Sequence, residues 1–418
     1  MRRFVFLSSF YWLLPVAIFA FFSCQNQGNR PAVLWTDRPE FALYAEYFNA
    51  AQDRYKVEVR YFESPALELE NSSRHPDIVV STSLKNTSTR VYFKSLDWHF
   101  TNKSFSKASF YSRLLAMGEV DGSQYLLPVS FNAPVIIFAR DKAELLSSPF
   151  IVGFDEMKKL SKGFNKESNG VYTRMGFSPT WDDGFLFTTA ALFNAAFREA
   201  APLAWDSPAL ERAMSYVYDW TNQINSSVQA EEDFTFKYFF DPPVKLVLSN
   251  RILFTCVNSC DFFTLPEDRQ KALDFRWLAE KNSIPLNEGS VYLGIARKGK
   301  APKSARAFVD WFFQAHTQRH ILEKTRDFRM LETSFGIGGG FSALRPVTEQ
   351  VFPQFYPGLL GHIPPQDYFA PGNVLPKNWA SLKEHAVLPY LHERSRHANR
   401  NEVVSLERRI ADWIRLNR

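Results

Sequence analysis

Residues 32–62 read AVLWTDRPEFALYAEYFNAAQDRYKVEVRYF, and this stretch decides the fold class of the chain. Residues 32–35 form a short apolar run typical of a strand. A polar segment with Pro39 and Glu40 follows, as at the first turn of a helix. Apolar residues then recur at the three-and-four spacing of an amphipathic helix, at Phe41, Tyr44, Ala45, Phe48 and Ala51. Residues 56–62 and 77–81 predict two further strands, so the order indicates a βαβ start to a parallel sheet.

Four residues fall where such sheets bind their ligands. In open α/β sheets, ligands lie beyond the carboxyl ends of the strands and close to helix N-termini. Trp35, Asp37 and Arg38 follow the first strand, and Ser83 follows the third. We expect these residues to contact a ligand, although capping of the helix N-terminus explains Asp37 equally well.

The N-terminus has the composition of an export signal. Arg2 and Arg3 precede an uncharged stretch over residues 4–22, which ends at Ser23 and Cys24. This junction resembles a bacterial lipoprotein signal, so residues 1–24 are expected to be the signal and Cys24 the lipidated residue. The alternative is an uncleaved membrane helix, because the apolar run approaches the ~20 residues that span a bilayer. Either way, the remaining chain would be exported and tethered to a membrane.

Length, charge and cysteine content limit the function classes. A chain of 418 residues exceeds the size at which one core keeps growing, so at least two lobes are expected. The net charge of +5 comes without a long basic block, which argues against nucleic-acid binding. Cys256 and Cys260 do not have the spacing of a metal site. We expect them either to pair as a disulfide in an oxidising compartment or to be two buried free thiols.

An extended apolar stretch over residues 126–138 is expected to cross between the lobes. It follows a turn at Asp121 and Gly122, and it places Phe131 and Asn132 at its middle, where they could reach a ligand. Tyr292 lies in another predicted strand, over residues 291–296, and is a further candidate. Residues 335–378 are rich in proline, glycine and aromatic residues and predict irregular surface structure.

Trp181, Asp182 and Asp183 form the strongest candidate for ligand binding. An aromatic face packs against the C–H groups of a sugar, while carboxylates accept hydrogen bonds from its hydroxyls. The alternative role is capping, because acidic residues stabilise the start of a helix. The chain has no P-loop and no G-x-S-x-G motif. His392 and His397 are five residues apart, so their side chains would not lie on the same face of a helix. Neither a metal site nor a catalytic site is therefore expected.

The order of motifs resembles the bacterial extracellular solute-binding proteins of family 1, the maltodextrin-binding type, over nearly the whole mature chain. The resemblance is carried by Asp121-Gly122 with Tyr125 and Pro128, by the helix start at residues 154–157, and by the apolar helix from Ala305. One departure is residues 248–252, LSNRI, which stand where the family commonly has a G-K-x-A-M motif.

This resemblance implies an α/β, two-lobed periplasmic-binding-protein type II fold. Each lobe would be a mostly parallel sheet flanked by helices, and a hinge would join the lobes. Residues 25–128 plus 292–328 would form lobe 1, and residues 129–291 plus 329–418 lobe 2. The ligand-contacting residues expected from sequence are Trp35, Asp37, Arg38, Ser83, Phe131, Asn132, Trp181, Asp182, Asp183 and Tyr292.

The resemblance also implies a function. The chain would capture a small solute outside the cytoplasm, a sugar or oligosaccharide, and deliver it to an ABC permease driven by a separate ATPase. Polyamines, phosphodiesters and metal chelates fit the same architecture. The alternatives are a surface lipoprotein of this fold that acts as an adhesin or structural protein, and a secreted glycan hydrolase. No cofactor is implied.

Overall fold

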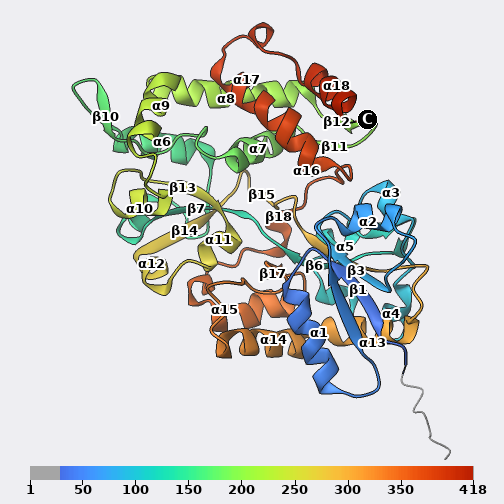
Figure 1. Ribbon diagram of the computed structural model, residues 1–418. Coiled ribbons are helices and arrows are strands. Elements are labelled where there is room, and N and C mark those ends of the chain that lie inside the picture. The colour runs from blue at the N-terminus through green and yellow to red at the C-terminus, as the bar shows by residue number, and fades with distance from the viewer. Residues whose placement is uncertain (1–28, 418) are drawn as a thin grey trace, which may run out of the picture.

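A computed structural model describes residues 29–417, which form two α/β lobes joined by a hinge (Figure 1). The predicted lipoprotein signal and Cys24 lie outside the described residues. Within residues 29–417, no helix has the length and apolar character needed to cross a membrane.

The first lobe is built on a six-stranded sheet with the order β17-β6-β16-β3-β1-β2. The strands are β1 (Ala32–Thr36), β2 (Val57–Tyr61), β3 (Ile78–Ser81), β6 (Leu127–Phe131), β16 (Val291–Ile295) and β17 (Phe341–Ser342). Strand β1 pairs in parallel with β2 and β3, and α1 (Glu40–Ala51) connects β1 to β2, as the opening sequence predicts.

Helices cover both faces of this sheet because its strands are apolar on both sides. Leu34 of β1 packs with Phe41 of α1 and Phe308 of α13 (Pro302–Phe312) on one face. Trp35 points to the other face, where it packs with Leu69 of α2 (Pro65–Asn71). The remaining helices of this lobe are α3 (Thr87–Arg90), α4 (Asp97–Thr101), α5 (Ser112–Ala116), α14 (Ala315–Asp327) and α15 (Phe352–Phe355).

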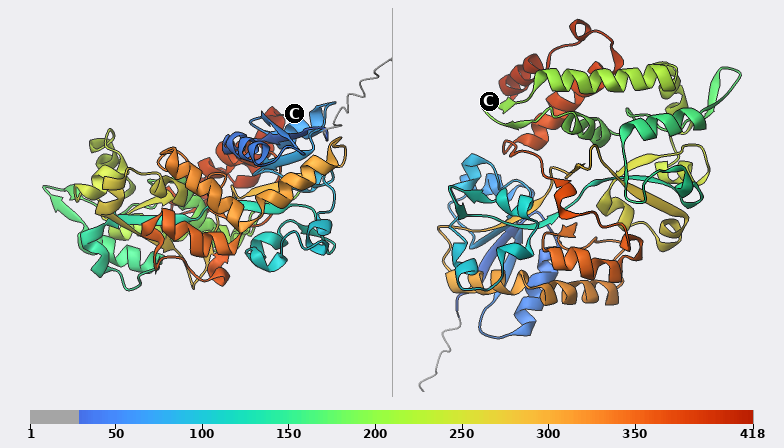
Figure 2. Two further views of the ribbon diagram at one scale, coloured as in Figure 1. Left: turned by 90° about the horizontal axis from the view of Figure 1, so that it is seen from below. Right: turned by 180° about the vertical axis from the view of Figure 1, so that it is seen from behind.

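The second lobe contains a four-stranded sheet with the order β13-β7-β14-β8. These strands are β7 (Pro134–Ala139), β8 (Ile151–Val152), β13 (Thr255–Asn258) and β14 (Leu273–Leu278). The helices around it are α6 (Phe154–Phe164), α7 (Asp183–Leu192), α8 (Ser207–Ile224), α9 (Val228–Lys237), α10 (Pro243–Leu248), α11 (Ser259–Phe263) and α12 (Glu267–Ala272). The C-terminal helices α16 (Trp379–Leu382), α17 (Leu388–Arg396) and α18 (Leu406–Leu416) lie over α7 and α8, as Figure 1 and the opposite view in Figure 2 (right) show.

Both sheets are mixed, which corrects the prediction of mostly parallel sheets. Strands β6 and β16 run antiparallel to their neighbours in the first sheet, and β7 runs antiparallel to both β13 and β14 in the second. The reason is topological: β6 leads out of the first lobe into β7, and β16 returns from the second lobe. Strand β6 therefore leaves its sheet toward the hinge, whereas β7 and β16 enter their sheets from the hinge side.

Two of the predicted lobe boundaries differ from the sheets. Strand β6 stays in the first sheet as far as Phe131, beyond the expected boundary at residue 128. Strand β17 also belongs to the first sheet, although residues 329–418 were assigned to the second lobe. Phe341 pairs with Phe131 and Ser342 with Ser130. These segments are about 210 residues apart in the chain, so no local sequence pattern predicts their contact.

Candidate functional site

Two cavities lie beside the hinge, and they share a wall. The first cavity has a volume of about 700 Å³ and the second about 760 Å³. The shared wall comprises Phe187, Ala191, Pro285, Leu286, Asn287 and Glu288. This wall combines α7 with the segment that leads from β15 (Ile284–Pro285) into β16.

The first cavity has an aromatic wall formed by α7, α9 and the loop before α7. Trp181 and Phe234 stack with their ring centroids 5.7 Å apart and their planes at 18°. Tyr238 continues the wall 4.9 Å from Phe234. Phe177 meets Trp181 edge to face at 6.1 Å. Such a flat apolar surface can pack against the C–H face of a sugar ring.

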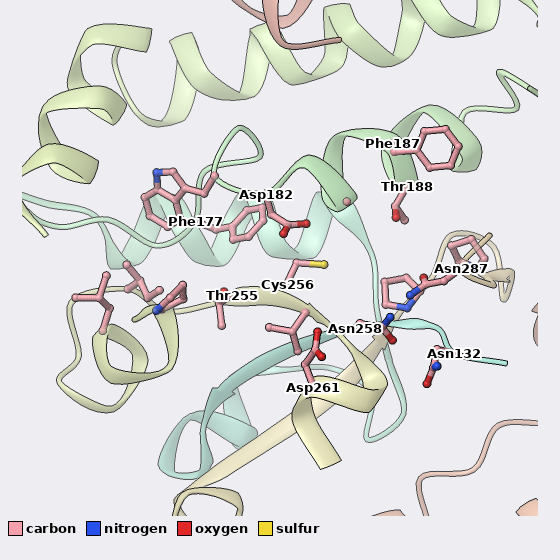
Figure 3. A pocket seen from close by; sticks show the side chains of 18 of the residues that line it. Asn132, Phe177, Asp182, Phe187, Thr188, Thr255, Cys256, Asn258, Asp261 and Asn287 are labelled. Carbon is pink, nitrogen blue, oxygen red and sulfur yellow. The ribbon is translucent and has the colours of Figure 1, made fainter. Parts of the chain in front are cut away.

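Polar side chains line the same cavity as this aromatic wall (Figure 3). They come from α7 and its N-cap, from β13, from α11 and from the hinge segment. The set consists of Asp182, Thr188, Thr255, Asn258, Asp261 and Asn287. Within residues 29–417, the side chains of Thr188, Thr255 and Asn287 form no hydrogen bond. The cavity thus offers donors and acceptors beside an aromatic surface, the combination found in ligand sites.

Asp182 caps a helix and also lines the first cavity, so its position fits both of the roles considered from sequence. One carboxylate oxygen caps α7 by accepting a hydrogen bond from Phe185 N at 2.6 Å. The other oxygen has no hydrogen-bond partner within residues 29–417. Burial raises the pKa of this carboxyl group and the charge of Asp183 raises it further, whereas the Phe185 N–H group opposes the shift. Asp182 can therefore cap the helix and also meet a ligand hydroxyl.

Asp183 turns away from the first cavity. Its carboxylate pairs with the imidazole of His392 on α17, and Asp183 lines neither cavity. The side chain therefore ties the start of α7 to the C-terminal helices.

Asn132 lies in the first cavity, but its side-chain amide is used by the hinge. The amide donates to Gly339 O at 2.8 Å and accepts from Ser259 Oγ at 2.8 Å. The backbone carbonyl oxygen of Asn132 accepts from Asn287 N at 2.9 Å. Asn132 therefore braces the three chain segments that meet at the hinge.

The structure does not bring Trp35, Phe131 or Tyr292 to either cavity. Trp35 is 2% exposed and packs against Phe62 with ring centroids 4.7 Å apart. Phe131 is buried against Tyr111, and the Tyr292 hydroxyl donates to Leu114 O at 2.8 Å. Their side chains alternate into the cores on the two faces of the first sheet, away from the strand ends.

Asp37, Arg38 and Ser83 gather at the carboxyl ends of β1 and β3, as predicted, yet they line neither cavity. Asp37 accepts from Arg38 Nε at 3.0 Å and from Ser81 Oγ at 2.7 Å. Ser81 Oγ lies 3.4 Å from Ser83 Oγ. The carboxylate of Asp37 is therefore occupied by its neighbours.

Cys256 and Cys260 are free thiols, so the disulfide alternative is wrong. Cys256 lies on β13 and lines the first cavity, whereas Cys260 lies on α11 with its sulfur 3.4 Å from Asp261 Oδ1. Asn258 starts α11 between them, and the change of element directs the two side chains to different surroundings. Burial raises the pKa of the Cys256 thiol well above its ordinary value, which favours the neutral thiol over the thiolate.

Several cavity residues were missed from sequence. Phe234, Thr255 and Asn287 lie on three separate elements and meet only through the tertiary fold. Phe234 had a weak signal, because it belongs to the aromatic-rich run 234–240, FTFKYFF. Within residues 29–417 no cluster of three metal-ligating side chains occurs.

No family model matches the chain, and no curated protein matches it in sequence. Solved structures do share its fold. One is an ABC substrate-binding protein from Listeria monocytogenes in complex with cycloalternan. It is 12% identical, with a TM-score of 0.60, over 91% of this chain and 96% of that one. Another is the cyclic alpha-maltosyl-1,6-maltose binding protein from Arthrobacter globiformis. It is 14% identical, with a TM-score of 0.62, over 92% of this chain and 97% of that one.

A sugar transporter from Rhizobium etli in an open conformation is also similar, with 11% identity and a TM-score of 0.64. The similarity covers 92% of this chain and 98% of that one. These likenesses extend over both lobes and the hinge. The chain therefore has the two-lobed periplasmic-binding-protein type II fold.

Proposed function

We propose that this chain is the substrate-binding protein of an ABC importer and that it holds a sugar or oligosaccharide in the first cavity. The observation that carries the proposal is the stacked pair of Trp181 and Phe234, which faces polar side chains across the cavity. The sugar ligands named for the structural neighbours support the same reading.

The first cavity lies where closure of the lobes would enclose a ligand. Asn132 and Asn287 of the hinge line it together with elements of the second lobe. A ligand that binds the closed form more tightly than the open form shifts the population toward closure. Recognition of that closed form by permease subunits, with a separate ATPase, would complete the import cycle.

We further infer that the chain acts outside the cytoplasm and is tethered through a lipid on Cys24. The support is the order of residues within 1–24, where two arginines precede an uncharged apolar stretch that ends at Ser23 and Cys24. Metabolic labelling with a radioactive fatty acid should label the chain, and the Cys24→Ser variant should stay unlabelled. An unlabelled parent chain would contradict the anchor without affecting the sugar site.

The proposal is tested by a thermal-shift and calorimetry screen of residues 25–418, which include every described element. Malto- and manno-oligosaccharides form the first panel. A ligand at 100 times its Kd should add about 2.7 kcal/mol to the free energy of unfolding. This corresponds to a rise in Tm of roughly several degrees.

Trp181→Ala should weaken binding of any hit by about tenfold or more, because the sugar loses its stacking surface. Trp98→Ala is the matched control, since Trp98 is 41% exposed and lines neither cavity. A folded chain that binds no saccharide would contradict the proposal. Release of new reducing ends from an oligosaccharide would instead favour a glycan hydrolase.

A further inference from the structure

The second cavity differs from the first in its charges and in its position between the lobes. It is lined by Lys85 from the first lobe and by Asp155, Arg212 and Tyr216 from the second. Through Asn287 and Glu288 it adjoins the first cavity. An elongated ligand could therefore reach from one cavity toward the other.

The acidic side chains of the second cavity are already engaged. Asp155 accepts from the Tyr216 hydroxyl at 2.9 Å, and Glu280 accepts from Phe154 N at 2.7 Å. Glu288 forms an ion pair with Lys383. Each of these carboxylates therefore has a partner on the protein, and Glu288 Oε2 is the oxygen among them that is buried without a hydrogen bond within residues 29–417.

The basic side chains of the same cavity are not engaged in this way. Within residues 29–417, no carboxylate lies within 4.0 Å of the charged nitrogens of Lys85, Arg212 or Lys281. Arg212 and Lys281 are exposed, so water can solvate them. Lys85 is only partly exposed, so water solvates its ammonium less than the other two cations, and no carboxylate of residues 29–417 compensates within 4.0 Å.

The surroundings of Lys85 hold it in place and disfavour its charge. Its Nζ lies 4.5 Å from the ring centroid of the buried Tyr292. Asn86 donates to Ser83 O at 2.8 Å, and Arg90 Nη2 donates to Lys85 O at 2.6 Å, so the loop that carries Lys85 is fixed. Burial and the charge of Arg90 lower the pKa of Lys85 to about 8. A partly desolvated cation without a counter-ion is costly, and an arriving anion would offset that cost.

We propose that the second cavity binds an anionic group, a carboxylate or phosphate, and that Lys85 holds it. The group has two sources: an acidic unit of a saccharide whose other units occupy the first cavity, or a separate anion. If the anionic group belongs to a saccharide, the inference rests on the proposed function and the substrate is an acidic oligosaccharide. If a separate anion binds, the inference does not depend on the proposed function.

The experiment is calorimetric titration of the full chain at pH 7 with three probes. These are a disaccharide ending in glucuronic acid, its neutral glucose counterpart, and inorganic phosphate. We expect one of the two anionic probes to bind at least tenfold more tightly than the neutral one. Lys85→Gln should remove this preference by lowering the affinity for the anionic probe about tenfold or more, which is the effect of losing a charge-assisted hydrogen bond. Lys303→Gln is the control, because Lys303 is exposed on α13 and should leave every affinity unchanged.

Each outcome decides the question. A preference for the glucuronate probe that Lys85→Gln removes assigns the anion to the saccharide, and the same result with phosphate alone assigns a separate anion. Tight binding of the neutral probe with no anion preference overturns this inference and leaves the proposed function standing. Phosphate binding that needs Lys85, without any saccharide binding, supports the inference and contradicts the proposed function. The Tm of Lys85→Gln without ligand should be unchanged or raised, which separates lost binding from lost folding.

Discussion

At the scale of single residues, Glu231 links the aromatic wall of the first cavity to the lobe beneath it. Its carboxylate accepts from Thr180 Oγ1 at 2.8 Å and from Asn225 Nδ2 at 2.7 Å. Thr180 directly precedes Trp181, and Glu231 lies one turn before Phe234 on α9. The buried carboxyl group therefore fixes both stacked rings.

Burial raises the pKa of Glu231 above its ordinary value of 4.5, and its hydrogen bonds only partly oppose this shift. The folded chain therefore holds a proton at pH values where the unfolded chain has released it. Stability consequently falls as pH rises from 4.5 through the folded-state pKa. Glu231→Gln should flatten this part of the pH profile in urea unfolding. Glu232→Gln, at an exposed neighbour on the same helix, should retain the parent's slope. Equal slopes for parent and Glu231→Gln would refute the assignment.

At the scale of elements, Asp182 caps the start of α7 and also lines the first cavity. Asp182→Ala removes the cap on Phe185 N and should cost about 1 kcal/mol of unfolding free energy. Asp206→Ala is a matched control, because Asp206 caps α8 through Ala209 N at 2.8 Å and lines neither cavity. Both variants should lose similar stability by thermal unfolding, while only Asp182→Ala weakens saccharide binding. Equal binding losses in both variants would show that stability alone is responsible.

The glycine-rich turn over residues 336–340 is a second element with a definite role. It braces the hinge, because Gly338 O accepts from Ser130 Oγ at 3.2 Å and Gly336 N donates to the Tyr356 hydroxyl at 2.9 Å. Gly336 has a φ of +62°, and an added Cβ would collide with Gly340 O and the ring of Phe352. The turn therefore accepts only glycine at this position.

Gly336→Ala should destabilise the chain by about 3 kcal/mol or more, from backbone strain together with overpacking. Gly361→Ala isolates the strain, because Gly361 has a φ of +75° but open space around its Cβ position. It should cost about 1 kcal/mol. Chemical denaturation measures both variants, and equal losses would mean that the steric contact at Gly336 relaxes freely.

At the scale of the whole molecule, polar contacts join the two lobes away from the hinge. Glu199 of β11 (Arg198–Glu199) accepts from Thr87 N at 3.0 Å and from Thr87 Oγ1 at 2.9 Å. Lys377 Nζ lies 2.5 Å from Glu70 Oε2. These contacts connect the tip of the first lobe to the second lobe and to the segment before α16.

Glu199→Ala should increase the population of open molecules, because it removes hydrogen bonds to Thr87 that exist only while the lobes are close together. Solution X-ray scattering should show a larger radius of gyration without ligand, and saccharide affinity should fall about two- to tenfold. Glu402→Ala is the control, because Glu402 is an exposed acidic residue of the C-terminal region that lines neither cavity. An unchanged radius with unchanged affinity in Glu199→Ala would contradict this role.

Local sequence was sufficient for the elements that periodicity and capping define. The order β1-α1-β2 is confirmed, because strand and helix periodicity act within a few residues. The two-lobed α/β fold, which chain length and the family resemblance predict, is also confirmed. The capping role of Asp182 is local in the same way, and the residue that caps α7 also lines the first cavity.

Only the tertiary structure decided which distant segments meet. Residues 335–378 were expected to be irregular surface, yet Phe341 and Phe352 are buried in a core that joins both lobes. Trp35 and Tyr292 were expected at the ligand and lie in the first lobe's core. Sheet order and lobe packing bring four further residues to the cavities, namely Phe234, Thr255, Asn287 and Lys85. A sequence pattern reports the periodicity of one segment, whereas a cavity depends on contacts between segments that are far apart along the chain.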